Sequence, residues 1–95
     1  MAAYLVANID VTDPAGYDDY RKGVLATITQ YGGRFLVRGG AVEPLEGEWR
    51  PKRVVILEFP TLEQAQQWWD SPEYRPLKDL RRRASNGDLF LVAGV

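Results

Sequence analysis

The sequence predicts an α+β fold, a ferredoxin-like βαββαβ chain with a four-stranded antiparallel sheet whose helices cover one face. Strand and helix patterns follow one another in the order strand, helix, strand, strand, helix, strand. A turn-rich stretch at Pro44–Glu48 joins the two middle strands. The chain has 95 residues, of which 45% are hydrophobic and 26% charged, as expected for one core. We therefore expect a single domain over residues 1–95.

The first strand and the first helix are marked by their periods and by capping residues. Apolar residues alternate over Ala3–Val11, which is the period of a strand. Asp13 and Pro14 are residue types typical of a helix N-cap and of the first helical position. Apolar side chains then recur every three or four residues up to Tyr31. The pair Gly32-Gly33 follows and predicts a left-handed cap.

The middle of the chain predicts a long hairpin made of the strands Arg34–Val42 and Arg53–Phe59. Hairpin register depends on the turn, and a slip of one residue moves every side chain to the other face. If the turn centres near Gly47-Glu48, Arg38 lies opposite Glu58. Within the second strand, Gly39-Gly40 predicts a bulge or tight bend.

Two further helices and one strand are expected after the hairpin. Thr61 and Gln64 have the spacing of a capping box, which begins a helix with Trp68 and Trp69 on it. Ser71 followed by proline repeats the cap signal, so a separate short helix should follow. The remaining expectations are a helix over Pro72–Arg83, a turn at Asn86-Gly87 and a final strand over Leu89–Val95.

Arg38 is the most informative charged residue, because alternation places it on the same strand face as Leu36. An unpaired buried arginine would cost several kcal/mol, so it needs an anionic partner, and Glu58 is the candidate. In one interpretation the two form a structural ion pair between strands. In the other they form the charged floor of a pocket, where Arg38 binds a carboxylate or enolate oxygen and Glu58 is the general base.

Five other residues are candidates for binding a ligand near this pair. Asn8 lies on the neighbouring first strand, and Tyr20 faces the sheet from the middle of the first helix. Trp68 and Trp69 are adjacent and cannot point the same way, so one should pack in the core while the other lines a cleft or a dimer contact. Trp69 is the ligand-binding candidate of the two. The last two candidates, Tyr74 and Arg81, are seven residues apart on one helix face. They either reach the pocket mouth or anchor the helix on a neighbouring chain. The run Arg81–Arg83 favours a solvated helix end over a phosphate patch.

Composition excludes several functional classes. The chain has no cysteine and no histidine, which removes thiol catalysis, the Ser-His-Asp triad and nearly all zinc sites. We expect no metal and no organic cofactor. The net charge of −1 gives no electrostatic reason to bind nucleic acid or an anionic membrane. No apolar segment approaches the ~20 residues of a membrane span, and no signal peptide pattern is present, so a cytoplasmic location is expected.

Both faces of the predicted sheet are largely apolar, although helices can cover only one. One face carries Leu5, Ala7, Ile9, Phe35, Val37, Val55, Leu57 and Phe59, and the other carries Tyr4, Val6, Leu36, Val54 and Ile56. A monomer would leave one face wet, beyond the few hundred Å² of apolar patch that monomers usually expose. We therefore expect a homodimer.

Several short motifs resemble a known family, domain of unknown function 1330. They are Tyr31-Gly-Gly-Arg34, Arg38-Gly-Gly40, Glu58-Phe-Pro60 and Trp69-x-Ser-Pro-Glu-Tyr74, with Arg81 further on. The resemblance covers the whole chain and implies a ferredoxin-like protomer whose sheet packs on its twin's to form a dimeric α/β barrel. It also implies a pocket between sheet and helices in each protomer. Relatives in that superfamily include cofactor-independent monooxygenases, lactone isomerases and haem-degrading enzymes, but this chain lacks the histidine that haem binders use.

Two functional hypotheses follow. The first is a dimeric barrel that binds a small organic acid or phenolic metabolite without metal or cofactor, and that isomerises or oxidises it. The second is a non-catalytic dimeric structural or binding module in which Arg38 and Glu58 only fasten the sheet.

Overall fold

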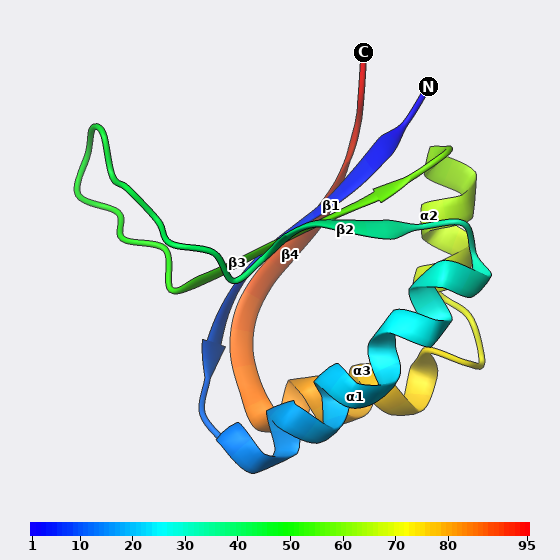
Figure 1. Cartoon of the computed structure of the whole chain (residues 1–95), viewed down its shortest axis with the longest axis horizontal. Coiled ribbons are helices and arrows are strands. Elements are labelled where there is room, and N and C mark those ends of the chain that lie inside the picture. The colour runs from blue at the N-terminus through cyan, green and yellow to red at the C-terminus, as the bar shows by residue number, and fades with distance from the viewer.

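The computed structural model describes all residues from 1 to 95 and has a four-stranded sheet with three helices on one face (Figure 1). The elements, in chain order, are β1 (Ala3–Val11), α1 (Pro14–Gln30), β2 (Arg34–Arg38), β3 (Arg53–Phe59), α2 (Leu62–Trp69), α3 (Arg75–Ala84) and β4 (Ser85–Ala93). The strand order is β2-β3-β1-β4 and every neighbouring pair is antiparallel. The predicted ferredoxin-like α+β fold is confirmed, with α2 and α3 as separate helices.

The helix boundaries follow the predicted capping residues. The side chain of Asp13 accepts a hydrogen bond from the Gly16 amide at 3.2 Å, at the start of α1. Thr61 accepts from the Gln64 amide at 3.1 Å at the start of α2. Ser71 accepts from the Tyr74 amide at 3.1 Å, so it caps the turn that leads into α3. Each bond satisfies a backbone donor that the first turn of a helix leaves without a partner.

The predicted turn at Asn86-Gly87 is wrong, because β4 begins at Ser85, directly after α3. Gly87 pairs with Ile9 of β1 inside the sheet. A Cβ atom on Gly87 would lie 2.6 Å from the carbonyl oxygen of Asn8. The glycine therefore marks a close approach of two strands, which local sequence cannot distinguish from a turn.

The predicted hairpin register is also wrong. Arg34 lies opposite Glu58 and Arg38 lies opposite Val55, with a bulge between Phe35 and Val37. The bulge puts Phe35 and Arg38 on the helix-covered face, because their partners Leu57 and Val55 face the helices. Arg38 is therefore not on the face expected from Leu36, and Val37, opposite Ile56, is on the outer face.

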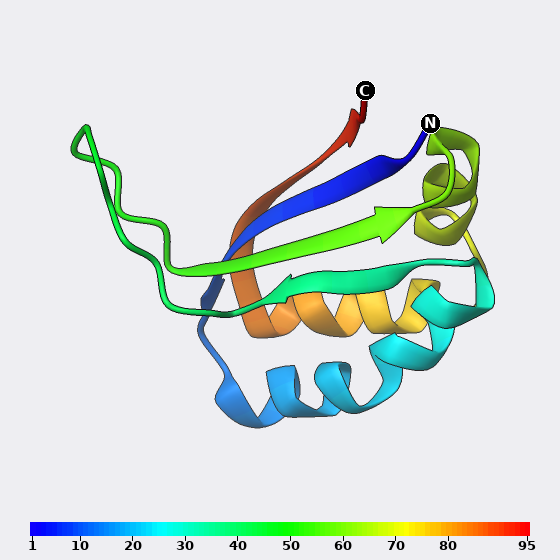
Figure 2. The ribbon, with the colours of Figure 1, turned by 45° about the horizontal axis from the view of Figure 1, so that its top comes forward.

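The connection between β2 and β3 explains why its midpoint does not set the register. β2 ends at Arg38 and not at Val42, so residues 39–52 form a long arm that extends from the body of the protein (Figure 2). Leu45 is 91% exposed on this arm and Trp49 is 70% exposed. A tight turn dictates register, but a long arm leaves it to the strands, which pair so that Phe35 and Leu57 share the covered face.

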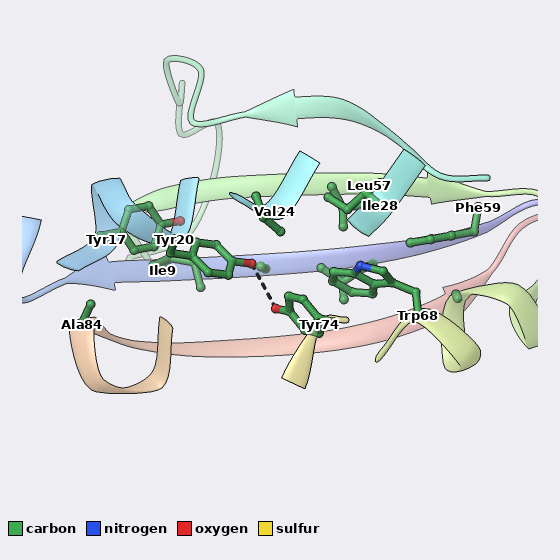
Figure 3. Packing of buried hydrophobic residues seen from close by; sticks show 13 residues of the cluster. Ile9, Tyr17, Tyr20, Val24, Ile28, Leu57, Phe59, Trp68, Tyr74 and Ala84 are labelled. Carbon is green, nitrogen blue, oxygen red and sulfur yellow. Dashed lines mark hydrogen bonds between the residues drawn. The ribbon is translucent and has the colours of Figure 1, made fainter. Parts of the chain in front are cut away.

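The core lies between the sheet and the three helices (Figure 3). Trp68 of α2 is its largest side chain and is 1% exposed. Its ring lies 4.0 Å from that of Tyr74 and 5.5 Å from that of Phe59, measured between centroids. The buried members of the α1 stripe are Tyr17, Tyr20, Val24, Thr27 and Ile28. Burial of this apolar surface is the main stabilising term of such a fold.

The opposite face of the sheet carries an apolar row that crosses all four strands. Phe90 lies opposite Val6, Val6 opposite Ile56, and Ile56 opposite Val37. No helix covers this row, and Phe90 is 57% exposed. None of the helices is long and apolar enough to span a membrane.

Candidate functional site

A narrow cavity of about 30 Å³ lies between the sheet, α1 and α3. Its lining consists of 13 hydrophobic side chains and four others, and all four are arginines. These are Arg21 of α1, Arg38 of β2, Arg53 of β3 and Arg81 of α3. Carboxylates are absent from the lining, so the cavity is an apolar space that contains only positive charge.

The inner end of the cavity is formed by Tyr20, Tyr74 and Arg81. The two tyrosines point their hydroxyl groups toward each other, 3.0 Å apart (Figure 3). Arg81 donates from Nε to the Tyr74 hydroxyl at 3.4 Å. The structure thus brings together three of the residues that the sequence predicted for ligand binding.

Arg81 is the most unusual of these side chains, because it is only 5% exposed and pairs with no carboxylate. The only hydrogen bond of its guanidinium is the long one to Tyr74. The ring of Trp69, with its centroid 5.9 Å away, offers a weak cation–π contact. Arg81 also lines the groove beside β4, and its terminal nitrogens are not among the enclosed atoms that lack a partner. A mostly buried guanidinium without an anionic partner carries a desolvation cost that a negative ligand group would offset. The interpretation of residues 81–83 as a solvated helix end is therefore wrong for Arg81.

The outer end of the cavity is formed by Arg38 and Arg53. The exposed side chain of Arg38 lies over the Phe35 ring, 4.4 Å from its centroid, and donates to the Arg21 carbonyl at 3.3 Å. The guanidinium of Arg53 lies 5.6 Å from the centroid of the Tyr17 ring. Its Nε atom is enclosed and has no hydrogen-bond acceptor. Leaving a buried donor without a partner costs about 1–3 kcal/mol.

Gly39 holds this end open for Arg53. The glycine has φ +73°, a backbone conformation that other residues rarely adopt. A Cβ atom there would clash with the guanidinium of Arg53. The bend predicted at Gly39-Gly40 is confirmed at Gly39. Because this glycine has no side chain, it leaves room for Arg53 at the mouth of the cavity.

Three predicted site residues lie away from the cavity. Glu58 is on the outer face of the sheet, where its Oε1 pairs with Nη2 of Arg34 at 2.7 Å and accepts from Nε at 2.8 Å. The expected Arg38–Glu58 pair is therefore wrong, because the bulge and the register place the two on opposite faces. Asn8 accepts from the Lys52 amide at 2.8 Å near the base of the arm. Trp69 lines grooves beside β4.

Arg53 is the functional candidate that sequence reasoning missed. The signal was present, because Arg53 alternates with Val55, Leu57 and Phe59 and must share their helix-covered face. Arg21 was also missed, since it lies on α1 next to the buried Tyr20 and its side chain is exposed. The signal for Arg38 was misleading, because alternation assumes a regular strand and β2 contains a bulge.

The family of this chain follows from a comparison of its sequence with family models. Residues 2–95 match the model described as domain of unknown function 1330. The chain belongs to this family. A search of curated proteins found no match. The predicted family resemblance is confirmed. The description of this family states no activity.

Solved structures similar to this family member share its fold at low sequence identity. A protein of unknown function from Rhodopseudomonas palustris, RPA0582, is 16% identical with a TM-score of 0.78, covering 99% of this chain and 82% of its own. SnoaB, a cofactor-independent oxygenase from Streptomyces nogalater, is 14% identical with a TM-score of 0.67, covering 99% of this chain and 93% of its own. Rv0793 from Mycobacterium tuberculosis is 13% identical with a TM-score of 0.62, covering 100% of this chain and 96% of its own. At these identities the likeness establishes the fold.

The inner end of the cavity can donate hydrogen bonds to a negative oxygen. Burial, and then the neighbouring Tyr74, raise the pKa of Tyr20 well above its ordinary value of 10.0. Tyr20 therefore remains a neutral hydroxyl at physiological pH. Together with Arg81, the tyrosine pair resembles the preorganised donors that stabilise an enolate or a phenolate. Acidic side chains do not gather in groups of three or more that could hold a metal ion.

The raised pKa of Tyr20 predicts how stability depends on alkaline pH. The unfolded chain loses this proton near pH 10 and the folded chain only at higher pH, so this contribution is complete below pH ~10 and falls above it. The loss can reach about 1.4 kcal/mol per pH unit. We expect the free energy of unfolding of Tyr20→Phe to fall less steeply with pH above pH 10 than that of the wild-type protein, by up to this amount per pH unit. Urea denaturation across the alkaline range measures it, and equal slopes for both proteins would contradict the prediction.

Proposed function

We propose that this protein is a homodimer in which each protomer binds a small organic acid or phenolic metabolite in the cavity between the sheet and the helices. The observation that carries this proposal is the lining, in which every non-hydrophobic residue is an arginine. An apolar wall favours a hydrophobic body, and unpaired guanidinium groups favour an anionic or electron-rich oxygen. An apolar acid or phenol has both.

The proposed ligand is turned over without a metal or an organic cofactor, by isomerisation or by oxygenation. The donors at the inner end support this, since they would stabilise an enolate or phenolate form of the ligand and so favour its reaction. The likeness to SnoaB, itself described as a cofactor-independent oxygenase, also supports it. Glu58 is no longer part of this proposal, because it lies on the other face of the sheet. The catalytic role therefore falls to Arg81 and the tyrosine pair, with Arg38 as a ligand-binding residue.

Entry of a ligand requires side chains at the mouth to move. The cavity volume of about 30 Å³ accommodates one or two water molecules and is far below the several hundred Å³ of typical ligand pockets. Arg38 is exposed and held by one hydrogen bond of 3.3 Å, so its displacement costs little. Arg53 has an unused donor at Nε, which a ligand oxygen would satisfy.

Dimer formation would cover the outer face of the sheet. The row Phe90–Val6–Ile56–Val37 crosses all four strands on that face. A second copy presents the same row, so two sheets can pack face to face, as an isologous interface requires. The proposed assembly is the dimeric α/β barrel of the predicted fold.

A charge placed at the β4 end of this row should prevent the dimer. We expect wild-type protein to have twice the chain mass in solution and Phe90→Glu to have the mass of one chain, because a buried unpaired carboxylate opposes association. Light scattering coupled to size-exclusion chromatography measures both masses. Gln67→Glu, on the exposed surface of α2, adds the same charge outside this row and is the control. A wild-type monomer would refute the proposed dimer.

Arg38→Ala tests the cavity as a binding site. We expect a panel of small carboxylic acids, lactones, phenols and quinones to contain a compound that raises the melting temperature of wild-type protein by mass action. The affinity of a carboxylate hit should fall about tenfold or more in Arg38→Ala, because a charge-assisted hydrogen bond is lost. Arg83→Ala is the control, since Arg83 is exposed and lines no part of the cavity. Equal affinity in all three proteins would place the binding site elsewhere.

The alternative function is a non-catalytic dimeric module, and the small cavity volume favours it. In this module Arg34 and Glu58, not Arg38 and Glu58, fasten two strands. It predicts that no compound of the panel shifts the melting temperature.

A further inference from the structure

The cavity has two polar ends whose chemistry differs. The outer end presents two guanidinium groups, from Arg38 at the end of β2 and Arg53 at the start of β3. The inner end presents two hydroxyl groups and one guanidinium, from Tyr20, Tyr74 and Arg81. Tyr20 points its hydroxyl away from Tyr17, whose ring lies near Arg53, and toward Tyr74 (Figure 3). The Tyr20 ring therefore lies between the Tyr17 ring and the Tyr74 hydroxyl.

The outer end is suited to a full negative charge. Both side chains are cationic, and neither forms an ion pair with a carboxylate. Arg53 also holds a buried Nε donor without an acceptor. Guanidinium groups match the geometry of a carboxylate, which can accept two parallel hydrogen bonds. A carboxylate here would satisfy the unused donor and neutralise part of the charge.

The inner end is suited to a single oxygen atom. The tyrosine hydroxyls share one hydrogen bond, which uses one of their two protons whichever group is the donor. The other hydroxyl proton has no acceptor in the protein and can be donated to a ligand. Arg81 uses only Nε, so its terminal N–H groups are also unused. A phenol or enol oxygen can accept from these donors and, when protonated, can donate to a tyrosine oxygen.

We infer that the ligand of this cavity is a hydroxylated aromatic or enolic carboxylic acid, with its carboxylate between Arg38 and Arg53 and its hydroxyl oxygen at the Tyr20–Tyr74–Arg81 cluster. This inference rests on the proposed function and specifies its ligand class. An apolar ring between the two groups matches the hydrophobic wall between the two ends. Loss of either group from the ligand leaves buried donors without partners, so both groups contribute to affinity.

Matched benzene derivatives test the inference in isothermal titrations with the full chain. The probes are benzoate, phenol, the three isomers of hydroxybenzoate, and terephthalate. The inferred site binds one hydroxybenzoate isomer about tenfold or more tightly than benzoate or phenol, because each added polar group finds its own donors. The three isomers are needed because the position of the hydroxyl decides whether both ends are reached at once.

Two variants assign each polar group of the probe to one end. Tyr74→Phe removes only a hydroxyl, and in this variant the preferred hydroxybenzoate binds no better than benzoate. Arg38→Ala lowers the affinity for hydroxybenzoate and benzoate about tenfold and leaves that for phenol unchanged. Tyr31→Phe is the control for the first variant, because the Tyr31 hydroxyl bonds Glu73 outside the cavity. Arg83→Ala remains the control for the second.

The outcomes separate this inference from the proposed function. If benzoate binds as tightly as every hydroxybenzoate, or if terephthalate binds tighter than all of them, the two-ended assignment is wrong and the acid-binding cavity stands. If hydroxybenzoates are preferred but Tyr74→Phe keeps the preference, the hydroxyl lies elsewhere and the assignment is again wrong. If no probe binds and no compound of the wider panel raises the melting temperature, both the inferred ligand class and the proposed binding function are wrong.

Discussion

Trp68→Ala is expected to lower the free energy of unfolding by about 3–5 kcal/mol, the largest stability effect of any single substitution considered for this fold. The indole is 1% exposed and lies between the rings of Tyr74 and Phe59. Its Nε1 donates to the Thr27 hydroxyl at 3.0 Å, and that hydroxyl donates to the Val24 carbonyl at 2.8 Å. Alanine would leave a cavity where α1, α2 and the sheet meet.

A loss of this size is a large part of the 5–15 kcal/mol that stabilises a typical domain. The melting temperature should therefore fall by about 12 °C or more, or the variant should fail to fold. Chemical denaturation followed by near-ultraviolet circular dichroism measures the loss. Gln67→Ala changes an exposed residue one position earlier and should alter stability by less than about 0.5 kcal/mol. A loss below about 1 kcal/mol for Trp68→Ala would show that the site relaxes around the missing ring.

Arg81→Met is expected to have opposite effects on stability and on binding. Arg81 is buried without a carboxylate partner, so a side chain of similar length without charge removes a desolvation cost. The loss of its 3.4 Å hydrogen bond to Tyr74 offsets little of this gain, because Tyr74 keeps its bond to Tyr20. We expect the free energy of unfolding of the free protein to rise by about 1 kcal/mol.

The same substitution should lower the affinity for an acid or phenol ligand about tenfold or more, because the inner end loses its positive charge. Denaturant midpoints and titration calorimetry on the same sample measure both effects. Arg83→Met, on the same helix but exposed, should change neither. A marked loss of stability in Arg81→Met with unchanged binding would favour the structural module over the binding site.

The contrast between these two residues shows how burial alone does not define a role. Trp68 and Arg81 are both buried and both contact the aromatic cluster around Tyr74. The tryptophan satisfies its only polar atom within the protein, whereas the arginine keeps terminal donors free. A mostly buried arginine without an anionic partner is the kind of local cost that folded proteins retain at functional sites.

Much of the fold could be predicted from the sequence because its signals are local. The caps at Asp13 and Thr61 begin helices, and Ser71 caps the turn before α3, each through a hydrogen bond to a residue three positions away. The alternation in Ala3–Val11 and Arg53–Phe59 gave both strands their observed bounds. The turn predicted at Asn86-Gly87 was wrong because a local signal carries no information on the neighbouring strand that Gly87 approaches.

The candidate site was predicted only in part, because it depends on contacts between distant segments. The amino-acid sequence by itself determined the element types, the two apolar faces and the tyrosines and arginines available to a site. Only the tertiary structure decided which of these residues meet. The bulge after Phe35 places Arg38 on the helix-covered face, and the register places Glu58 opposite Arg34, with which it forms an ion pair. The physical reason is that strand pairing follows the burial of side chains over the whole sheet, and one inserted residue reverses every face beyond it.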